Sequence, residues 1–276
     1  MYNAEISRIN PGAFFILIDQ SGSMADWTEN GNTLSNEVAD IINRFLQELV
    51  IKCSKSEGVR NYFEVAVLAY GHKGCYNGLD GPLGQDFVHP ISSIADFPLK
   101  IEERKKKIPD GAGGVIEQNI NFPIWFEPVA NGGTPMCEAF HKVAELLVQW
   151  CDDHQESFPP IVINITDGEP TDGDPEPIVE QIKEISTADG NVLVFNVHLS
   201  TNSEKEIKFI DDSYPLFGPR EKKLFRMSSV LTPAMRSQLI NENSNVTDTS
   251  RGYIYNGSAF SLIELFEIGT RAANLR

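Results

Sequence analysis

Oxygen-bearing side chains follow two apolar runs that are predicted to be buried strands. The segment 19–23 (Asp-Gln-Ser-Gly-Ser) comes directly after the run 13–18, and the segment 166–169 (Thr-Asp-Gly-Glu) comes after the run 161–165. In an open α/β sheet, ligands bind outside the carboxyl ends of the strands. Carboxylate and hydroxyl oxygens without Cys or His suit Mg²⁺, Mn²⁺ or Ca²⁺ rather than zinc or copper. The two segments therefore predict a divalent-cation site.

The spacing within the first segment supports this prediction. Side chains at i, i+2 and i+4 of an extended loop project to one side, so Asp19, Ser21 and Ser23 can converge. Gly22 between them permits a tight turn. Mg²⁺ is the favoured ion because it binds few protein ligands and keeps several waters, which leaves a position for an outside ligand. Mn²⁺ accepts the same oxygen set, so the sequence does not separate the two ions.

A helix start lies in the middle of the chain, at the segment 132–135 (Gly-Gly-Thr-Pro). Thr134 is predicted to be the N-cap and Pro135 to lie in the first turn. The helix is expected to run to about Cys151, with an apolar stripe facing the core. That stripe comprises Met136, Phe140, Val143, Leu147 and Trp150.

Strand and helix patterns alternate along the chain. This alternation predicts an α/β fold with a mostly parallel, doubly wound central sheet and helices on both faces. The length favours one elaborated domain over residues 1–276. Strands are predicted over 13–18, 62–70, 161–165, 191–198 and 252–255, and helices over 33–53, 134–151, from 174 onwards, and over 258–271.

Two long segments are read as insertions into this pattern. Residues 71–130 are rich in Gly and Pro, and they are expected to form an edge strand, one short helix over 95–107 and exposed loops. Residues 200–250 are polar, with short helices expected over 203–210 and 233–241.

Composition excludes several classes of function. The formal charge of −16, from 39 acidic and 23 basic residues, opposes binding to a phosphate backbone, so no nucleic-acid partner is expected. The four cysteines form no C-x-x-C pair, which argues against a zinc or redox site and for a reducing compartment. The chain has neither a signal-peptide pattern nor an apolar run of membrane-spanning length. A cytoplasmic protein without a membrane partner is expected.

The motifs resemble those of von Willebrand factor A domains with a metal-ion-dependent adhesion site. Five positions match: the Asp-x-Ser-x-Ser motif at 19–23, a Thr that follows a glycine pair, and the Asp-Gly after the fourth strand. The resemblance implies a Rossmann-like fold in which Ser21, Ser23 and Thr134 are oxygen ligands of the ion. It implies that Asp19 and Asp167 bind the ion directly or through water. In that family, an Asp or Glu carboxylate of a partner protein usually completes the metal shell.

The segment 195–199 (Phe-Asn-Val-His-Leu) resembles bacterial A-domain proteins of the tellurite-resistance (TerY-like) and stress-response type. Some of these accompany kinases, phosphatases or AAA+ ATPases, so the resemblance implies a partner of one of these classes in a bacterial signalling or stress complex. The insertions at 71–130 and 200–250 depart from the compact family pattern and leave the choice of partner open.

Structural explanations compete with the metal site. Asp19 could end a strand while Ser21 and Ser23 bind turn amides, and Thr134 could act only as an N-cap. The acidic cluster of Glu169, Asp172 and Asp174 could support a metal or form a solvated turn with an N-cap. The basic run 104–107 (Arg-Lys-Lys-Lys) is read as a solvated helix face, with a steering patch for an acidic partner as the alternative.

An enzymatic function is the competing hypothesis. A Mg²⁺-dependent phosphohydrolase of haloacid-dehalogenase type also places an Asp after its first strand. That family requires a second Asp two positions later as acid/base, and Ser21 stands there. No Gly-x-Ser-x-Gly motif indicates a serine hydrolase either. We therefore expect no catalytic residues and no enzyme activity.

Overall fold

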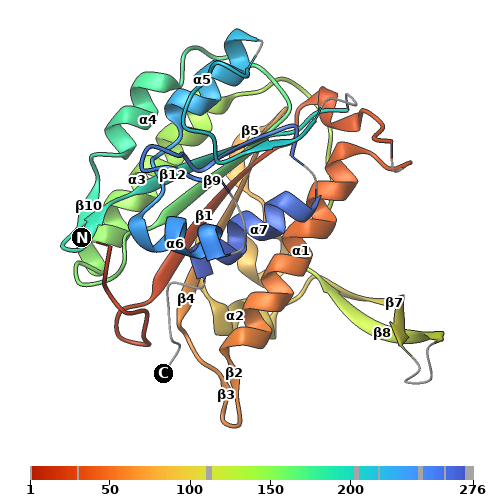
Figure 1. Ribbon diagram of the computed structural model, residues 1–276. Helices are drawn as coiled ribbons and strands as arrows, with labels where there is room; N and C mark the ends of the chain where they lie inside the picture. Colours follow the sequence, from red (N-terminus) through yellow and green to blue (C-terminus); the bar gives the residue numbers. More distant parts are fainter. Residues whose placement is uncertain are drawn as a thin grey trace.

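A mostly parallel sheet forms the centre of the protein (Figure 1). The computed structural model describes residues 2–29, 31–109, 114–201, 205–216, 218–241, 245–257 and 259–270. Neighbouring parallel strands run in the spatial order β4, β1, β9, β12, β14. Their bounds are Phe63–Gly71 for β4, Gly12–Asp19 for β1, Ile161–Thr166 for β9, Leu193–His198 for β12 and Tyr253–Tyr255 for β14. The prediction of an α/β fold with a mostly parallel central sheet is confirmed.

Antiparallel strands complete both edges of the sheet. Strands β5 (Gly74–Asn77) and β6 (Val88–Pro90) pair with β4, and β13 (Ile207–Lys208) pairs with β14. Without β6 and β13, the sheet runs β5, β4, β1, β9, β12, β14. Renumbered from 1 in chain order, these strands lie in the order 3-2-1-4-5-6, which is known from doubly wound dinucleotide-binding sheets. The edge strand expected within residues 71–130 is therefore present as β5.

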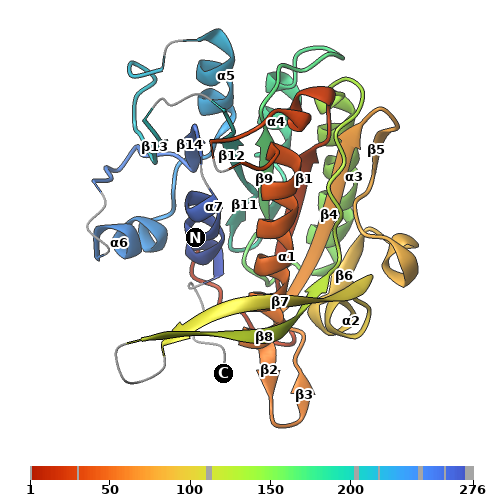
Figure 2. The same cartoon turned by 90° about the vertical axis from the view of Figure 1, so that its right-hand side faces the viewer.

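Helices cover both faces of the sheet (Figure 2). One apolar layer packs against α1, α2, α6 and α7, and the other packs against α3, α4 and α5. Side chains of β1 alternate between the two layers, as a strand with a period of two residues must. The helices are α1 (Leu34–Cys53), α2 (Ile91–Asp96), α3 (Met136–Asp153), α4 (Glu176–Ile182), α5 (Pro219–Met227), α6 (Pro233–Asn241) and α7 (Ala259–Thr270).

Short elements occupy the connections. Two 3₁₀ helices, η1 (Gly22–Ala25) and η2 (Gly81–Gly84), follow β1 and β5. Two small hairpins pair β2 (Ser54–Lys55) with β3 (Gly58–Val59), and β10 (Ser186–Thr187) with β11 (Gly190–Asn191).

The prediction of a helix over 95–107 is wrong. Helix α2 ends at Asp96, and β7 (Lys100–Pro109) pairs with β8 (Val115–Ile124) in a long antiparallel hairpin that projects from the domain (Figures 1 and 2). Contacts between the two strands stabilise the hairpin in place of a helix. The Arg104 guanidinium of β7, for example, lies 3.9 Å from the ring centre of Phe122 on β8. Arg104 also forms ion pairs with Asp40 of α1 and with Glu102. The basic run therefore lies on a strand and not on a helix face.

The second insertion was predicted in part. Helix α6 has the expected bounds of 233–241. The helix expected over 203–210 is wrong where the structure describes it, because residues 207–208 form β13; residues 202–204 lie outside the described part. Helix α5 was not predicted, although it packs on the α4 side of the sheet.

A chain of buried polar side chains crosses the sheet and ends at α5. The hydroxyl of Tyr70 donates to Asn164 at 2.8 Å, and the Asn164 amide donates to Asn196 at 3.0 Å. The Asn196 amide then donates to Ser228 at 3.0 Å, and the Ser228 hydroxyl donates to the Leu224 carbonyl of α5 at 2.8 Å. Because each of these buried groups is paired, the chain of bonds fixes α5 against β12 without leaving a polar group unsatisfied.

No helix among the described residues combines the length and apolar character that crossing a membrane would need.

Candidate metal centre

The five predicted ligands lie together at the carboxyl edge of the sheet. Asp19 ends β1 and Asp167 directly follows β9. A Cβ atom placed on Gly168 would lie 3.2 Å from Thr134 Oγ1, 3.6 Å from Asp19 Oδ2 and 3.9 Å from Ser21 Oγ. Oxygens from two separate loops therefore lie close to Gly168 of a third loop.

The remaining two residues join the same group. The hydroxyl oxygens of Ser21 and Ser23 are 3.1 Å apart, and Ser23 Oγ donates to Asp167 Oδ1 at 2.9 Å. The alternation expected in an extended loop thus brings both serines to one side, even though η1 begins at Gly22.

Backbone hydrogen bonds hold the loops of the site together. Asn131 N donates to Gln20 O at 2.7 Å, and Gly22 N donates to Gly132 O at 2.9 Å. His72 N donates to Asn131 O at 3.0 Å, which ties in the loop after β4. Gly132 has φ +88°, and a Cβ there would lie 2.5 Å from His72 Cα, so only glycine fits this close approach. These bonds place Thr134 beside Ser21.

Thr134 does not cap helix α3, which corrects the prediction from sequence. The N-cap is Pro135, and the cap role belongs to Asp172 of a distant loop. Its Oδ1 accepts from Cys137 N at 3.0 Å, and its Oδ2 accepts from Glu138 N at 2.9 Å. Because another carboxylate binds the free amides of the first turn, the Thr134 hydroxyl remains available to the metal centre.

Thr166 orients Asp19 from outside the group of predicted ligands, a role that its place in the segment 166–169 did not indicate. Its hydroxyl donates to Asp19 Oδ2 at 2.6 Å, while Ser21 N donates to Asp19 Oδ1 at 2.8 Å. These bonds orient the carboxylate from outside the group of ligands. The only sequence signal for Thr166 was its place beside Asp167 at the end of a strand.

The two aspartates are costly to ionise without a cation. Burial raises the pKa of Asp19 to about 6, against the hydrogen bonds from Thr166 and Ser21, which lower it. Asp167 contributes a smaller increase to the Asp19 pKa, and burial also raises the pKa of Asp167 itself. A bound cation would neutralise this charge and favour the ionised forms.

The donor set fits a hard divalent cation. Two carboxylates and three hydroxyls supply only oxygen, which Mg²⁺ and Mn²⁺ accept. In the described part of the chain, no three His, Cys, Asp or Glu side chains gather at one point, so a metal centre here depends on the hydroxyls. The described cysteines are all free thiols and take no part.

The acidic cluster of the β9–α4 loop serves several structural roles. Asp172 caps α3, and Asp174 Oδ1 accepts from Glu176 N at 3.2 Å and pairs with Lys223 of α5 at 2.9 Å. Glu169 is exposed.

Arg220 of α5 also contacts the candidate site, and no motif in the sequence indicated it. Its Nη1 donates to the carbonyl oxygen of Asp167 at 3.1 Å.

Comparisons with known proteins bear on the fold. Neither a family profile nor a curated protein sequence matches the chain. The solved pilus adhesin SpaC from Lactobacillus rhamnosus GG aligns over 98% of this chain and 31% of its own, with 12% identity and a TM-score of 0.53. At this identity the likeness shows a shared fold alone.

Two further solved structures align more weakly. The vWF domain of the type V pili tip protein Mfa5 from Porphyromonas gingivalis aligns over 58% of this chain and 39% of its own, with 14% identity and a TM-score of 0.34. The pilus adhesin RrgA from Streptococcus pneumoniae aligns over 59% of this chain and 21% of its own, with 16% identity and a TM-score of 0.32. At these TM-scores neither alignment shows a shared fold. The chain spans between 21% and 39% of the length of these three proteins. The SpaC alignment therefore bears on the fold alone, and the strand order agrees with the mostly parallel α/β sheet predicted from the sequence.

Proposed function

We propose that this chain is a divalent-cation-dependent protein-binding module. In this proposal, Mg²⁺ or Mn²⁺ binds Ser21, Ser23 and Thr134 directly, and binds Asp19 and Asp167 directly or through water. An Asp or Glu carboxylate of a partner protein completes the coordination shell. The chain acts as one domain with its two insertions, and it binds rather than catalyses.

The observation that supports this proposal most strongly is the convergence of the oxygens around Gly168. Two loops that are far apart in sequence bring Thr134, Asp19 and Ser21 within 3.2 to 3.9 Å of the Cβ position on Gly168, which lies in a third loop. A set of turn-forming residues needs no such meeting point, because each turn could satisfy its own amides separately.

Local charge makes carboxylate binding feasible on an acidic chain. A divalent ion facing two ionised aspartates is formally balanced, so the net charge of −16 does not act at the site itself. The partner's carboxylate would meet a cation with an open position, at a sheet edge where ligands are commonly bound.

The setting is a separate part of the proposal. The resemblance to A-domain proteins of the bacterial stress-response type favours a cytoplasmic complex with a kinase, phosphatase or AAA+ ATPase. SpaC is described as a pilus adhesin, and a carboxylate-binding module would serve adhesion outside the cell equally well. Partner capture from bacterial lysate with and without Mg²⁺ tests the first setting.

Isothermal titration of Mg²⁺ and Mn²⁺ into metal-stripped protein tests the site itself. We expect saturable binding that is lost in Asp19→Ala and in Asp167→Ala. Asp174→Ala is the matched control, because it removes a carboxylate from the same loop without touching the centre. Acetate is added in a parallel series as a small carboxylate that can complete the shell. Absence of binding both with and without acetate would sink the proposal, as would equal binding by all three variants.

A further inference from the structure

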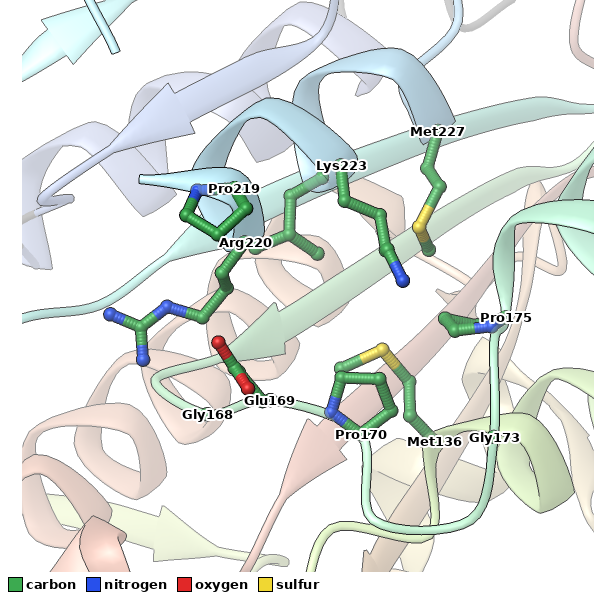
Figure 3. Close-up of a pocket in the computed structure, with 11 residues that line it drawn as sticks. Met136, Gly168, Glu169, Pro170, Gly173, Pro175, Pro219, Arg220, Lys223 and Met227 are labelled. Carbon is green, nitrogen blue, oxygen red and sulfur yellow. The ribbon is translucent and has the colours of Figure 1, made fainter. Parts of the chain in front are cut away.

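A cavity of about 280 Å³ lies between the loop 168–175 and helix α5 (Figure 3). Most of its lining is apolar, with side chains from α3, from the loop and from α5. The apolar lining residues are Met136, Pro170, Pro175, Pro219, Leu224 and Met227. Such a concave apolar surface with a few polar groups at its rim is typical of a binding pocket.

The cavity adjoins the metal centre. Gly168 lines the cavity, and the same residue stands within 3.2 to 3.9 Å of three of the predicted ligand oxygens, measured from its Cβ position. Arg220, at the rim, donates to the carbonyl oxygen of Asp167. A partner segment bound at the metal would therefore reach the cavity within a few residues, since an extended chain covers about 3.3 to 3.6 Å per residue.

Charged contacts fix the cavity walls. Besides Arg220 on Asp167, Lys223 pairs with Asp174 at 2.9 Å. Arg226 binds both carboxylate oxygens of Glu176, at 2.6 and 2.7 Å. These three contacts tie α5 to the loop 167–176 along its length, which defines the space between them before any ligand arrives.

The charges also indicate what the cavity accepts. The titratable lining residues are Glu169, Arg220 and Lys223, and both cations are paired with carboxylates, Arg220 with Glu221 and Lys223 with Asp174. Arg220 forms one hydrogen bond from each of its three nitrogens, which leaves two of its five N–H donors for a ligand. These two donors suit a carbonyl or carboxylate oxygen of a partner segment at the rim. The interior suits an apolar side chain, because the cations are already paired at the walls.

We propose that this cavity receives an apolar side chain of leucine or methionine size from the partner segment whose Asp or Glu completes the metal shell. The module would then recognise an acidic residue and a nearby apolar residue together, and the cavity would supply the selectivity that a bare carboxylate lacks. This inference rests on the proposed function of the metal centre.

Methionine NMR can observe both parts of the recognition. Two of the five methionines, Met136 and Met227, line the cavity, so ¹³C-methyl labelling places reporters inside it. Met136→Leu and Met227→Leu assign the signals with little loss of packing. The probes are terminally blocked peptides in Mg²⁺ buffer: Gly-Glu-Leu-Gly-Gly and Gly-Glu-Gly-Leu-Gly, with Gly-Glu-Gly-Ala-Gly and Gly-Gln-Gly-Leu-Gly as controls.

We expect a leucine peptide to shift both cavity methionine signals and to bind about fiftyfold more tightly than the alanine peptide, because three more carbons are buried. EDTA and Glu-to-Gln replacement should each abolish the shifts. Equal affinities of the leucine and alanine peptides, or unshifted Met136 and Met227 signals, would overturn the inference. A failed inference would leave the proposed function intact if Mg²⁺ titration of the same sample still shows a saturable site.

A filled cavity gives a second test. In Met227→Phe the larger ring is expected to occupy the cavity and bring the leucine-to-alanine affinity ratio close to one, with Mg²⁺ affinity unchanged. An unaltered ratio in a folded Met227→Phe protein contradicts the inference. Met235→Phe is the matched control, because Met235 is buried in α6 and does not line the cavity. Should Met227→Phe fail to fold, the wild-type peptide comparison decides alone.

Discussion

Asp19 shows how a proposed metal ligand can weaken the metal-free protein that carries it. Its carboxylate is buried, and its pKa in the folded state is about 6, above the value of 3.8 in an unfolded chain. Because the folded pKa is raised, the contribution of Asp19 to stability is fully present below about pH 4 and is lost as pH rises through 6. At neutral pH the metal-free protein therefore carries a destabilising charge.

We predict that Asp19→Asn raises the thermal stability of the metal-free protein at pH 7.5. Asn keeps the shape of the side chain and removes the charge, and the rise of the Asp19 pKa from 3.8 to about 6 corresponds to a gain of about 3 kcal/mol. The same variant should gain no stability from Mg²⁺, whereas the wild type should gain it by linkage. Melting curves in EDTA and in Mg²⁺ measure both effects. A less stable variant in EDTA would show that Asp19 stabilises the empty site.

Asp172 shows how one element can cap another. The sequence places it in an acidic turn, and only the fold brings it to the first turn of α3, where it accepts from two backbone amides. Its negative charge also suits the positive end of the helix dipole.

We predict that Asp172→Ala lowers the free energy of unfolding by about 1 to 2 kcal/mol, the range for loss of an N-cap. Thr134 precedes this helix, so Mg²⁺ affinity should fall as well. Urea titration and calorimetry measure the two effects. Glu169→Ala, in the same loop and exposed, is the control and should be close to neutral in urea. Equal stabilities of the two variants would argue against the cap.

The hairpin of β7 and β8 shows where local pattern misleads. A run of four basic residues suits a solvated helix face as well as a strand, because charge alone sets no period. The hydrogen-bonded register from the Lys100–Ile124 pair to the Pro109–Val115 pair decides in favour of strands. A helical pattern is sought among residues three or four apart, and the partners in this hairpin lie farther apart than that.

At the scale of the whole molecule, His198 links stability to acid. Its ring is buried beside Tyr255, with Glu221 Oε1 3.9 Å from Nε2 and Arg220 nearby. Burial lowers its pKa from 6.5 to about 4. Because the folded pKa is depressed, the neutral ring favours the folded state fully above about pH 6.5, and stability falls as pH drops towards 4.

We predict that His198→Leu removes part of this acid sensitivity. Neither ring nitrogen has a hydrogen-bond partner in the structure, so an apolar side chain should be tolerated at pH 7.5. At pH 5 the variant should be more stable relative to wild type than at pH 7.5, by about 2 kcal/mol. Urea titrations at the two pH values give the difference, with His141→Leu on the exposed face of α3 as control. A difference that does not change with pH would exclude His198 as the source.

The sequence by itself determined the main elements and the residue types of the candidate site. Buried parallel strands read as continuous apolar runs, and amphipathic helices repeat every 3.6 residues, so β1, β4, β9, α1 and α3 could be predicted from near neighbours. The positions of Asp19 and Asp167 after two such strands then followed from the geometry of a parallel sheet.

Only the tertiary structure decided which groups surround those residues. Three contacts join segments that are far apart along the chain. Thr166 donates to Asp19, Asp172 caps α3, and Arg220 donates to the Asp167 carbonyl oxygen. Helix α5 is mostly polar and short, and besides burying Leu224, Phe225 and Met227 it is held by a buried chain of side-chain hydrogen bonds to distant segments. Such contacts depend on three-dimensional proximity, which no periodicity in the sequence encodes. The cavity beside the candidate metal centre therefore exists only in the folded chain.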